Sequence, residues 1–271
     1  MYNYMIYYIL FFIDYLIIYI LSIFKKIINK GSNVDNLYVS LTTIPSRSNN
    51  LLFTINSILN QTIIPKKIFI TISKNNIREK NLKYNIHNKI KNHPLIQIIE
   101  IEEDNGPINK LYGGIINCKN NDDIFVTVDD DSIYHRFMLE NLYNSMIKYK
   151  HKAIGTIGRI NYNQKIFGYS SFTDIKVKML EGYGGVGYRK NFFTLRDIDT
   201  KELQKEVIFN DDIYISYILK NKNIDLILVP SQVKEPLSYT LFTRNTNPLW
   251  IQNEDNKLFN KCLQTLQLNN I

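Results

Sequence analysis

Three adjacent carboxylates, Asp129, Asp130 and Asp131, directly follow an apolar stretch in the sequence FVTVDDD. Like charges repel, and burying an unpaired carboxylate costs several kcal/mol unless its pKa shifts or a cation compensates. A divalent metal ion is a compact compensating charge, and hard carboxylate oxygens favour Mg²⁺ or Mn²⁺. Because side chains alternate along extended backbone, we expect Asp129 and Asp131 to share a metal site and Asp130 to point away from it.

The residues that follow the triplet test other roles for it. An EF-hand loop beginning at Asp129 would need an oxygen ligand at Ile133 and glycine at Tyr134, so a calcium loop is excluded. A phosphatase of the D-x-D-x-T type would need Thr or Val at Ile133. A solvated acidic turn that caps a helix beginning near His135 remains the structural alternative, because Asp favours helix N-termini.

Four apolar segments of strand-like composition alternate with three longer, mixed segments that are long enough for helices. This alternation predicts an α/β fold with a mostly parallel central sheet and helices on both faces. Ligands of such sheets bind beyond the carboxyl ends of the strands, and polar residues gather there after the first, third and fourth segments. The predicted strands are 37–43, 67–73, 95–101 and 123–128, and the predicted helices are 49–60, 78–91 and 108–117.

The 271-residue chain is long enough for one sizeable core, and we expect a single catalytic domain over residues 36–271. Its net charge of +8 suits an anionic partner. The lysines are scattered, however, so nucleic acid is not expected as a partner. Only two cysteines are present, Cys118 and Cys262, which is too few for a disulfide framework and does not form a CxxC zinc motif.

The first thirty residues differ from the rest. Residues 4–24 read YMIYYILFFIDYLIIYILSIF, which is long enough to cross a bilayer as a helix. The Ile, Leu and Phe residues of this segment contribute about −4 to −8 kcal/mol to insertion, against about +3 for Asp14. We therefore expect residues 1–30 to be the transmembrane anchor of a single-pass membrane protein. The lysines that follow place the catalytic domain on the cytoplasmic side by the positive-inside rule. A buried core helix is the alternative.

Five segments of the chain, in order, resemble the GT-A glycosyltransferases, especially those like family 2. VSLTTIPSRSNNLLFTINSILNQT resembles their opening strand, polar turn and helix, and EEDNGPINKLYGGI is similar to their Asp-Asn-Gly turn and the helix after it. FVTVDDD resembles the strand that carries the D-x-D metal motif, EGYGGVGYRKNFF the Gly-rich acceptor-side segment, and FNDDIYISYILKNKN the acidic pair that opens a late helix. The resemblance spans residues 37–229 and implies a single GT-A-like (Rossmann-like) domain.

The resemblance implies a metal-dependent glycosyltransferase that moves a sugar, expected to be a hexose, from a nucleotide-sugar donor such as a UDP-sugar. Asp131 and Asp129 would hold Mn²⁺ or Mg²⁺ against the donor diphosphate, where the metal stabilises the departing nucleoside diphosphate. Ordinary surface charge is the alternative for the two basic residues, Arg47 and Lys110. The residues expected to contact the donor are Thr43, Pro45, Arg47, Asn105, Lys110, Asp129 and Asp130.

An inverting transfer also needs a carboxylate that takes the proton of the acceptor hydroxyl, and Asp211 and Asp212 are the candidates. They precede a helix predicted over residues 213–220, and Asp212 matches the family's base position better. Capping of this helix is the alternative role for both residues.

The acceptor is expected on the side of the Gly-rich segment and is an unknown glycan, protein or lipid. Tyr183, Gly184 and Gly185 would contact it, because glycines allow close approach of the backbone to a sugar. Tyr183 and Tyr188 would offer aromatic faces for stacking.

Departures from the family pattern narrow the function. No Q-x-x-R-W sequence and no second apolar segment of spanning length are present, so a processive synthase is not expected. A catalytically inactive GT-A-like binding or scaffold protein is one alternative, against which the intact carboxylates argue. A sugar nucleotidyltransferase is another, and it would be expected to carry a Gly-rich basic signature where TTIPSRSNN has no glycine.

Overall fold

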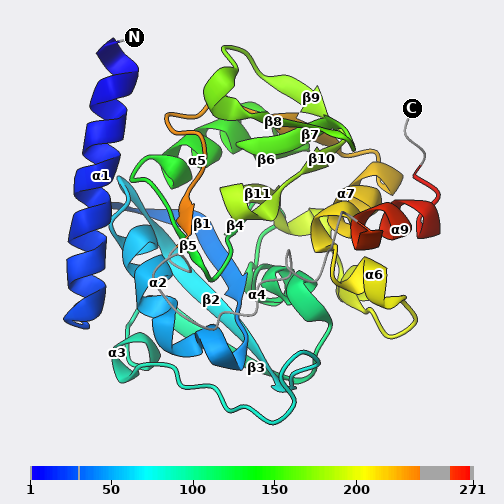
Figure 1. Ribbon diagram of the computed structural model, residues 1–271, viewed down its shortest axis with the longest axis horizontal. Helices are drawn as coiled ribbons and strands as arrows, with labels where there is room; N and C mark the ends of the chain where they lie inside the picture. The colour runs from blue at the N-terminus through cyan, green and yellow to red at the C-terminus, as the bar shows by residue number, and fades with distance from the viewer. Residues whose placement is uncertain (1, 30, 239–256, 269–271) are drawn as a thin grey trace.

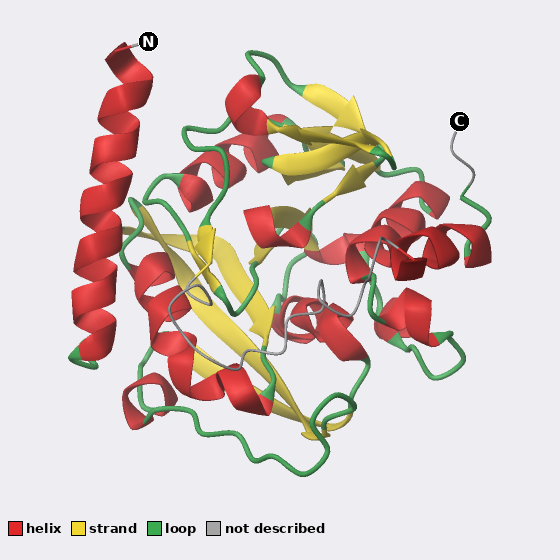
Figure 2. Cartoon of the chain, viewed as in Figure 1, coloured by secondary structure: helices red, strands yellow, loops and turns green. Residues whose placement is uncertain are grey.

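The computed structural model describes residues 2–29, 31–238 and 257–268, and an eight-stranded sheet runs through its centre (Figures 1 and 2). The first four strands of this sheet run parallel to one another, and so do β6 and β12, whereas β11 and β9 are antiparallel to their neighbours. The predicted α/β class with a mostly parallel sheet is therefore confirmed. In spatial order the strands are β3 (Ile96–Glu103), β2 (Ile63–Asn75), β1 (Ser32–Thr42), β4 (Ile124–Thr127), β11 (Val186–Arg189), β6 (Lys152–Gly155), β12 (Asp225–Leu228) and β9 (Ile175–Val177).

Both faces of the sheet are covered, which explains why its strands read as continuous apolar runs. Along β1, Leu37 and Val39 belong to the core on one face, and Tyr38 belongs to the core on the other. The first face packs against α2 (Leu51–Leu59), α3 (Asn88–Lys91) and α5 (Met138–Lys148), and the second against α4 (Tyr112–Asn117) and α7 (Asp211–Asn221).

Smaller elements border the central sheet and complete the described part of the chain. The hairpin of β7 and β8 adds β10 to make one small sheet, and β13 pairs with β5 to make another. Their bounds are β5 (Ser132–Ile133), β7 (Ile157–Asn161), β8 (Gln164–Phe167), β10 (Met179–Leu180), β13 (Leu237–Ser238), α6 (Lys205–Ile208) and α9 (Lys257–Thr265). The short 3-10 helices are η1 (Pro45–Asn50), η2 (Gly106–Leu111), η3 (Gly168–Ser170), η4 (Gly182–Gly184), η5 (Lys190–Phe192) and η6 (Leu195–Ile198).

One predicted helix is mostly absent, because residues 78–91 form a loop that becomes helical only in α3. The Asn76 side chain accepts hydrogen bonds from the backbone N–H groups of Arg78 and Glu79. The backbone N–H of Asn85 donates to Ser48 Oγ, 2.8 Å away. These bonds satisfy backbone groups that a helix would otherwise pair, and side chains of this kind commonly compete with helix formation.

The N-terminal segment forms the helix α1 (Tyr2–Ile23), but the prediction of a transmembrane anchor is wrong. Among the residues that the structure describes, no helix combines the length and the apolar character that crossing a bilayer requires. The predicted single-pass localisation, with its cytoplasmic catalytic domain, is corrected accordingly.

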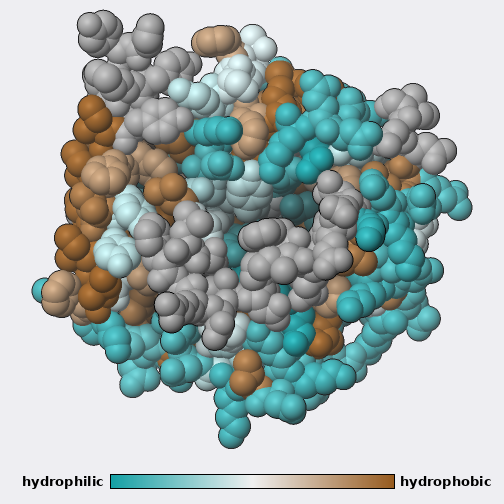
Figure 3. Space-filling model, viewed as in Figure 1, coloured by the Kyte–Doolittle hydropathy of each residue, from teal (hydrophilic) through white to brown (hydrophobic). Residues whose placement is uncertain are grey.

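The helix α1 lies along α2 and contacts the rest of the protein (Figure 1). The carboxylate of Asp14 is buried and accepts hydrogen bonds from the guanidinium of Arg136, whose Nε lies 2.7 Å away. Ile18 packs with Tyr15 and Ile133. Asp14 therefore has a charged partner within the chain. The opposite face of α1 is exposed and apolar (Figure 3), with Ile9, Phe12, Ile13, Leu16, Ile20 and Ile23.

Candidate active site

A pocket of about 710 Å³ lies at the carboxyl ends of β1 and β4. These strands are adjacent and parallel, so the residues that follow them emerge at the same edge of the sheet. The first half of the chain contributes Thr43, Arg47 and the aspartate triplet to the pocket, and the second half contributes the first turn of α7 and the turn η4. Segments that lie far apart in the sequence thus line one cavity.

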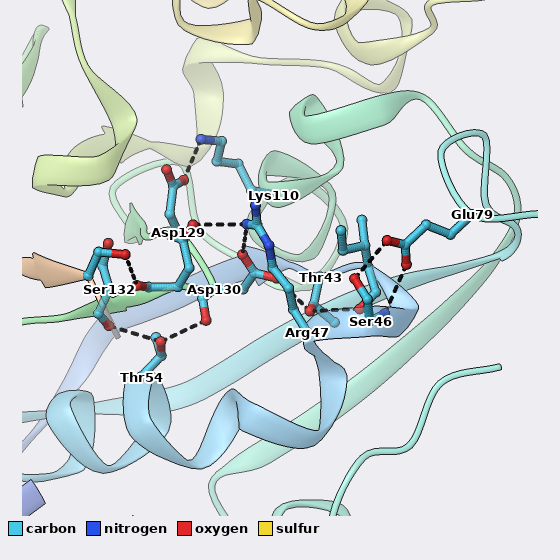
Figure 4. Close-up of polar contacts among 12 residues, drawn as sticks. Thr43, Ser46, Arg47, Thr54, Glu79, Lys110, Asp129, Asp130 and Ser132 are labelled. Atoms are coloured by element: carbon cyan, nitrogen blue, oxygen red, sulfur yellow. Dashed lines mark hydrogen bonds and ion pairs between the residues drawn. The ribbon is translucent and has the colours of Figure 1, made fainter. Parts of the chain in front are cut away.

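The aspartate triplet lies in a turn between β4 and β5, where Asp129 contacts Lys110 and Asp130 contacts Thr43 and Arg47 (Figure 4). Asp130 is buried, with Thr43 Oγ1 at 2.6 Å and Arg47 Nη1 at 2.8 Å from its oxygens. The same guanidinium nitrogen lies 3.0 Å from Asp131. The expected alternation therefore does not hold for Asp130 and Asp131, because the turn brings both carboxylates to one cation.

The surroundings of Asp131 suit a bound cation. Burial and the neighbouring Asp130 raise the pKa of Asp131 to about 6, and Arg47 only partly offsets them. The described lining of the pocket holds eight Asp or Glu and five Lys or Arg residues, a formal charge of −3 when every group is ionised. A donor diphosphate is itself anionic, so a compensating cation would favour its binding here.

Asp129 and Asp131 fit the way in which Mg²⁺ and Mn²⁺ usually bind. Within the described ranges, no cluster of three or more His, Cys, Asp and Glu side chains is arranged to hold a metal by itself. Such ions commonly take one or two protein carboxylates and complete their shell with phosphate oxygens and water. The carboxylates of Asp129 and Asp131 are 31% and 21% exposed, so ligand atoms from the pocket can reach both.

Lys110 connects the triplet to the acidic pair that opens α7. Its Nζ lies 2.8 Å from Asp129, 3.0 Å from Asp211 and 3.9 Å from Asp212. Burial alone would lower the pKa of this ammonium, but the three carboxylates hold it well above its usual value. Lys110 is therefore a charged, buried link between the two acidic groups and not an ordinary surface lysine.

The two aspartates of α7 occupy the first helical turn, and the predicted late helix is confirmed. Burial raises the pKa of both carboxyl groups, and the Asp211 charge raises that of Asp212 further. The side chain of Asp211 is 11% exposed, whereas that of Asp212 is 29% exposed. Asn210 is the N-cap residue of α7, so neither aspartate occupies the capping position.

The pocket collects some of the predicted site residues but not all of them. Pro45 begins η1 and is buried away from the cavity. The Oδ1 of Asn105 accepts a hydrogen bond from the backbone N–H of Thr200, and the neighbouring Asp104 lines the pocket instead. The predicted residues that do line it are Thr43, Arg47, Lys110, Asp129, Asp130, Asp131, Tyr183, Asp211 and Asp212.

Most of the Gly-rich segment supports the fold. A Cβ on Gly184 would meet the side chain of Ile157 at 2.8 Å, and Gly185 adopts a φ of +83° against Met138. Tyr188, expected as a stacking face, is buried and packs edge-on to Phe193. In this segment, only Tyr183 among the predicted acceptor-side residues reaches the pocket.

Several lining residues were not expected from the sequence. Arg78 belongs to the loop that was predicted to be a helix, and burial lowers the pKa of its guanidinium. The others come from the β7–β8 hairpin, the start of η4 and the later part of the chain. No spacing motif relates them in the sequence, although Glu181 directly precedes the Gly-rich stretch. They are Arg78, Arg159, Lys165, Glu181, Glu235 and Phe259.

Comparisons with known proteins identify the family of the chain. A sequence profile described as Glycosyl transferase family 2 matches residues 44–212, which is more than half of the chain. A search of curated proteins found no match. The solved structures that resemble the chain include one titled "Crystal structure of GalNAc-T7 with UDP, GalNAc and Mn2+", at 12% identity and a TM-score of 0.46. That match covers 74% of this chain and 42% of the matched protein. The chain therefore spans less than half of the length of the matched protein. By the profile match, the chain belongs to glycosyl transferase family 2.

Proposed function

We propose that this glycosyltransferase is inverting and non-processive and moves a hexose from a nucleotide-sugar donor to an acceptor hydroxyl. The observation that carries the proposal is the Lys110 link, which joins the aspartate triplet to the acidic pair of α7 within one pocket. The first group suits a donor diphosphate and its metal. The second supplies a carboxylate close enough to serve the same reaction.

The donor would lie along the first half of the pocket. Arg47 and Lys110 would contact the diphosphate as fixed positive charges. Thr43 would keep Asp130 and Arg47 in place through its hydrogen bond to Asp130. Asp129 and Asp131 would hold Mn²⁺ or Mg²⁺, which supplies Lewis-acid stabilisation of the negative charge that develops on the leaving diphosphate.

The acceptor would approach from the second half, past Tyr183. Asp212 would accept the proton of the acceptor hydroxyl while the oxygen of that hydroxyl forms a bond to the sugar C1. The bond between C1 and the donor phosphate oxygen breaks, and the nucleoside diphosphate leaves with the electron pair. Asp212 is favoured over Asp211 because it is more exposed and its ion-pair distance to Lys110 is longer.

A thermal-shift panel of UDP-, GDP- and CMP-sugars, with and without Mn²⁺, tests the donor class. We expect one nucleotide class, with UDP the first candidate, to raise the melting temperature in a Mn²⁺-dependent way. The stabilising donor is then assayed for release of its nucleoside diphosphate and for sugar transfer to a glycan mixture. Binding with neither release nor transfer would favour the inactive binding protein. Pyrophosphate release from a nucleoside triphosphate and a sugar phosphate would favour a nucleotidyltransferase.

A further inference from the structure

The turn η4 touches the proposed catalytic base directly. The backbone of Gly182 lies against the Asp212 carboxylate, and its N–H lowers the pKa of that carboxyl group. A Cβ on Gly182 would lie 2.7 Å from Asp212 Oδ1 and 2.6 Å from Lys110 Nζ. Both distances are shorter than any real Cβ contact, so only glycine allows the backbone to come this close. The position of η4 therefore determines one of the contacts that orient Asp212.

The residue before this turn is held by two ion pairs. The carboxylate of Glu181 is 8% exposed, with Arg159 Nε at 2.7 Å and Lys165 Nζ at 2.5 Å. Arg159 also donates from NH1 to the carbonyl of Tyr162, which fixes the guanidinium on the β7–β8 hairpin. The backbone N–H of Glu181 donates to the Ile157 carbonyl on the same hairpin. Side chain and backbone together attach the start of η4 to β7 and β8.

We infer that Glu181 is a positioning residue for glycosyl transfer, which acts by placing the Gly182 amide against Asp212. The inference rests on the proposed function, because it requires Asp212 to be the base. A displacement of about 1 Å in a reacting group can cost about 100-fold in rate. Replacing Glu181 by Gln keeps its shape but removes the charge that attracts Arg159 and Lys165. The turn can then shift away from Asp212 without loss of the donor-binding residues.

A purely structural role for Glu181 makes a different prediction, and Glu206 offers a matched control. Glu206 is also a buried glutamate, with Lys261 Nζ 3.3 Å from its Oε1, but it lies in α6 and does not line the pocket. If burial of an ion-paired carboxylate were all that mattered, Glu181→Gln and Glu206→Gln would have similar consequences. Both variants should lower thermal stability, and only the Glu181 variant should slow transfer.

The test measures turnover and donor affinity in four variants of the full chain. They are Glu181→Gln, Glu206→Gln, Asp212→Asn and the double variant Glu181→Gln with Asp212→Asn. We expect Glu181→Gln to lower kcat at least about tenfold with unchanged donor affinity, and Glu206→Gln to leave kcat unchanged. In the Asp212→Asn background, Glu181→Gln should cause no further loss, because residues that act as one unit are not additive.

Three results would overturn the inference. Equal effects of the two glutamate variants on kcat would leave Glu181 with a structural role only. Losses that multiply in the double variant would show that Glu181 acts independently of Asp212. Full turnover by Asp212→Asn would show that Asp212 is not the base, and the positioning role of Glu181 would be lost with it. This failure of the proposed function is distinguishable from the other two results because it appears in the Asp212→Asn variant alone. As a second perturbation of the same contact, Gly182→Ala should slow transfer at least as much as Glu181→Gln.

Discussion

Asp211 and Asp212 are neighbours in the sequence, but their contacts differ. Asp211 is the closer partner of the buried Lys110, whereas Asp212 is more exposed and lies against the Gly182 backbone. We therefore expect Asp212→Asn to lower turnover by about 10²–10⁴-fold, the usual loss for a general base, with near-normal donor affinity. Steady-state transfer rates and calorimetric donor binding measure the two quantities separately. A severe loss for Asp211→Asn with Asp212→Asn unaffected would move the base by one residue.

Lys110 is the residue on which the charge balance of the site depends most. Without its ammonium, the carboxylates of Asp129, Asp211 and Asp212 would lose their common cation. Breaking a buried ion pair at one partner typically costs about 3–5 kcal/mol, so we expect Lys110→Met to lower the free energy of unfolding by that amount. Urea unfolding measures it, and adding Asp211→Asn should restore part of the loss.

An exposed ion pair provides the control for Lys110. Lys148 is 62% exposed and pairs with Asp174 at 2.6 Å. Water and salt screen the charges of an exposed ion pair, so Lys148→Met should change the free energy of unfolding only slightly. Equal losses for Lys110→Met and Lys148→Met would contradict the view that Lys110 compensates buried charge.

At the scale of elements, α1 contributes to stability through one buried carboxylate. Asp14 is 1% exposed and is paired with Arg136, which lies between the aspartate triplet and α5. Arg136 is about one-third exposed, so water compensates part of its charge when Asp14 is removed. We expect Asp14→Ala to lower the free energy of unfolding by about 2–3 kcal/mol. Chemical denaturation measures this loss, and an unchanged midpoint would mean that α1 is not part of the cooperative fold.

A buried histidine that packs against α1, His135, should make the stability of the protein sensitive to acid. Burial lowers the pKa of His135 from 6.5 to about 4, and the ring packs edge-on against Phe11 of α1. The unfolded chain therefore takes up the proton at a higher pH than the folded protein does. Stability should fall as the pH drops from 6.5 to 4, by up to about 3 kcal/mol from this residue. His135→Asn should remove that part of the pH dependence, which unfolding curves at pH 7 and 4.5 would measure. An unchanged dependence would assign the acid sensitivity to other groups.

Strands and helices were predictable from the sequence where a local pattern of apolar residues identified them. The strands around Val39 and Val126 are buried on both faces, so their apolar runs identified them. The prediction of a helix over residues 78–91 is wrong because the hydrogen bond between Asn85 and Ser48 joins segments that lie far apart in the sequence. The contact of α1 with the rest of the fold is also non-local, because summed hydrophobicity does not reveal that Arg136 lies opposite Asp14.

For the whole molecule, the sequence located the first half of the pocket better than the second. Motifs after β1 and β4 are local, and the parallel register of the sheet then brings Thr43 and Asp130 within hydrogen-bond distance. The ion pair between Arg159 and Glu181 joins residues that lie 22 positions apart in the sequence. No local sequence pattern predicts it. The resemblance to GT-A enzymes supplied the general location of Asp211 and Asp212, but the link through Lys110 required the fold.

The whole-molecule charge distribution leads to the last prediction. The chain carries a net charge of +8, which attracts anions at long range, whereas the described pocket lining has a formal charge of −3 when every group is ionised. A nucleotide sugar should therefore reach the protein easily but bind weakly until a cation offsets the carboxylates. We expect Mn²⁺ with a saturating UDP-sugar, at about 100 times its Kd, to stabilise the protein by about 2.7 kcal/mol, and the UDP-sugar with EDTA to stabilise it much less. Unfolding monitored with each combination tests this, and Asp131→Asn serves as the control because it should lose the Mn²⁺-dependent part while it remains folded. If the variant kept the full Mn²⁺ effect, Asp131 would not be a metal ligand. Equal stabilisation of the wild-type protein with and without Mn²⁺ would instead assign charge compensation to Arg47 and Lys110 alone.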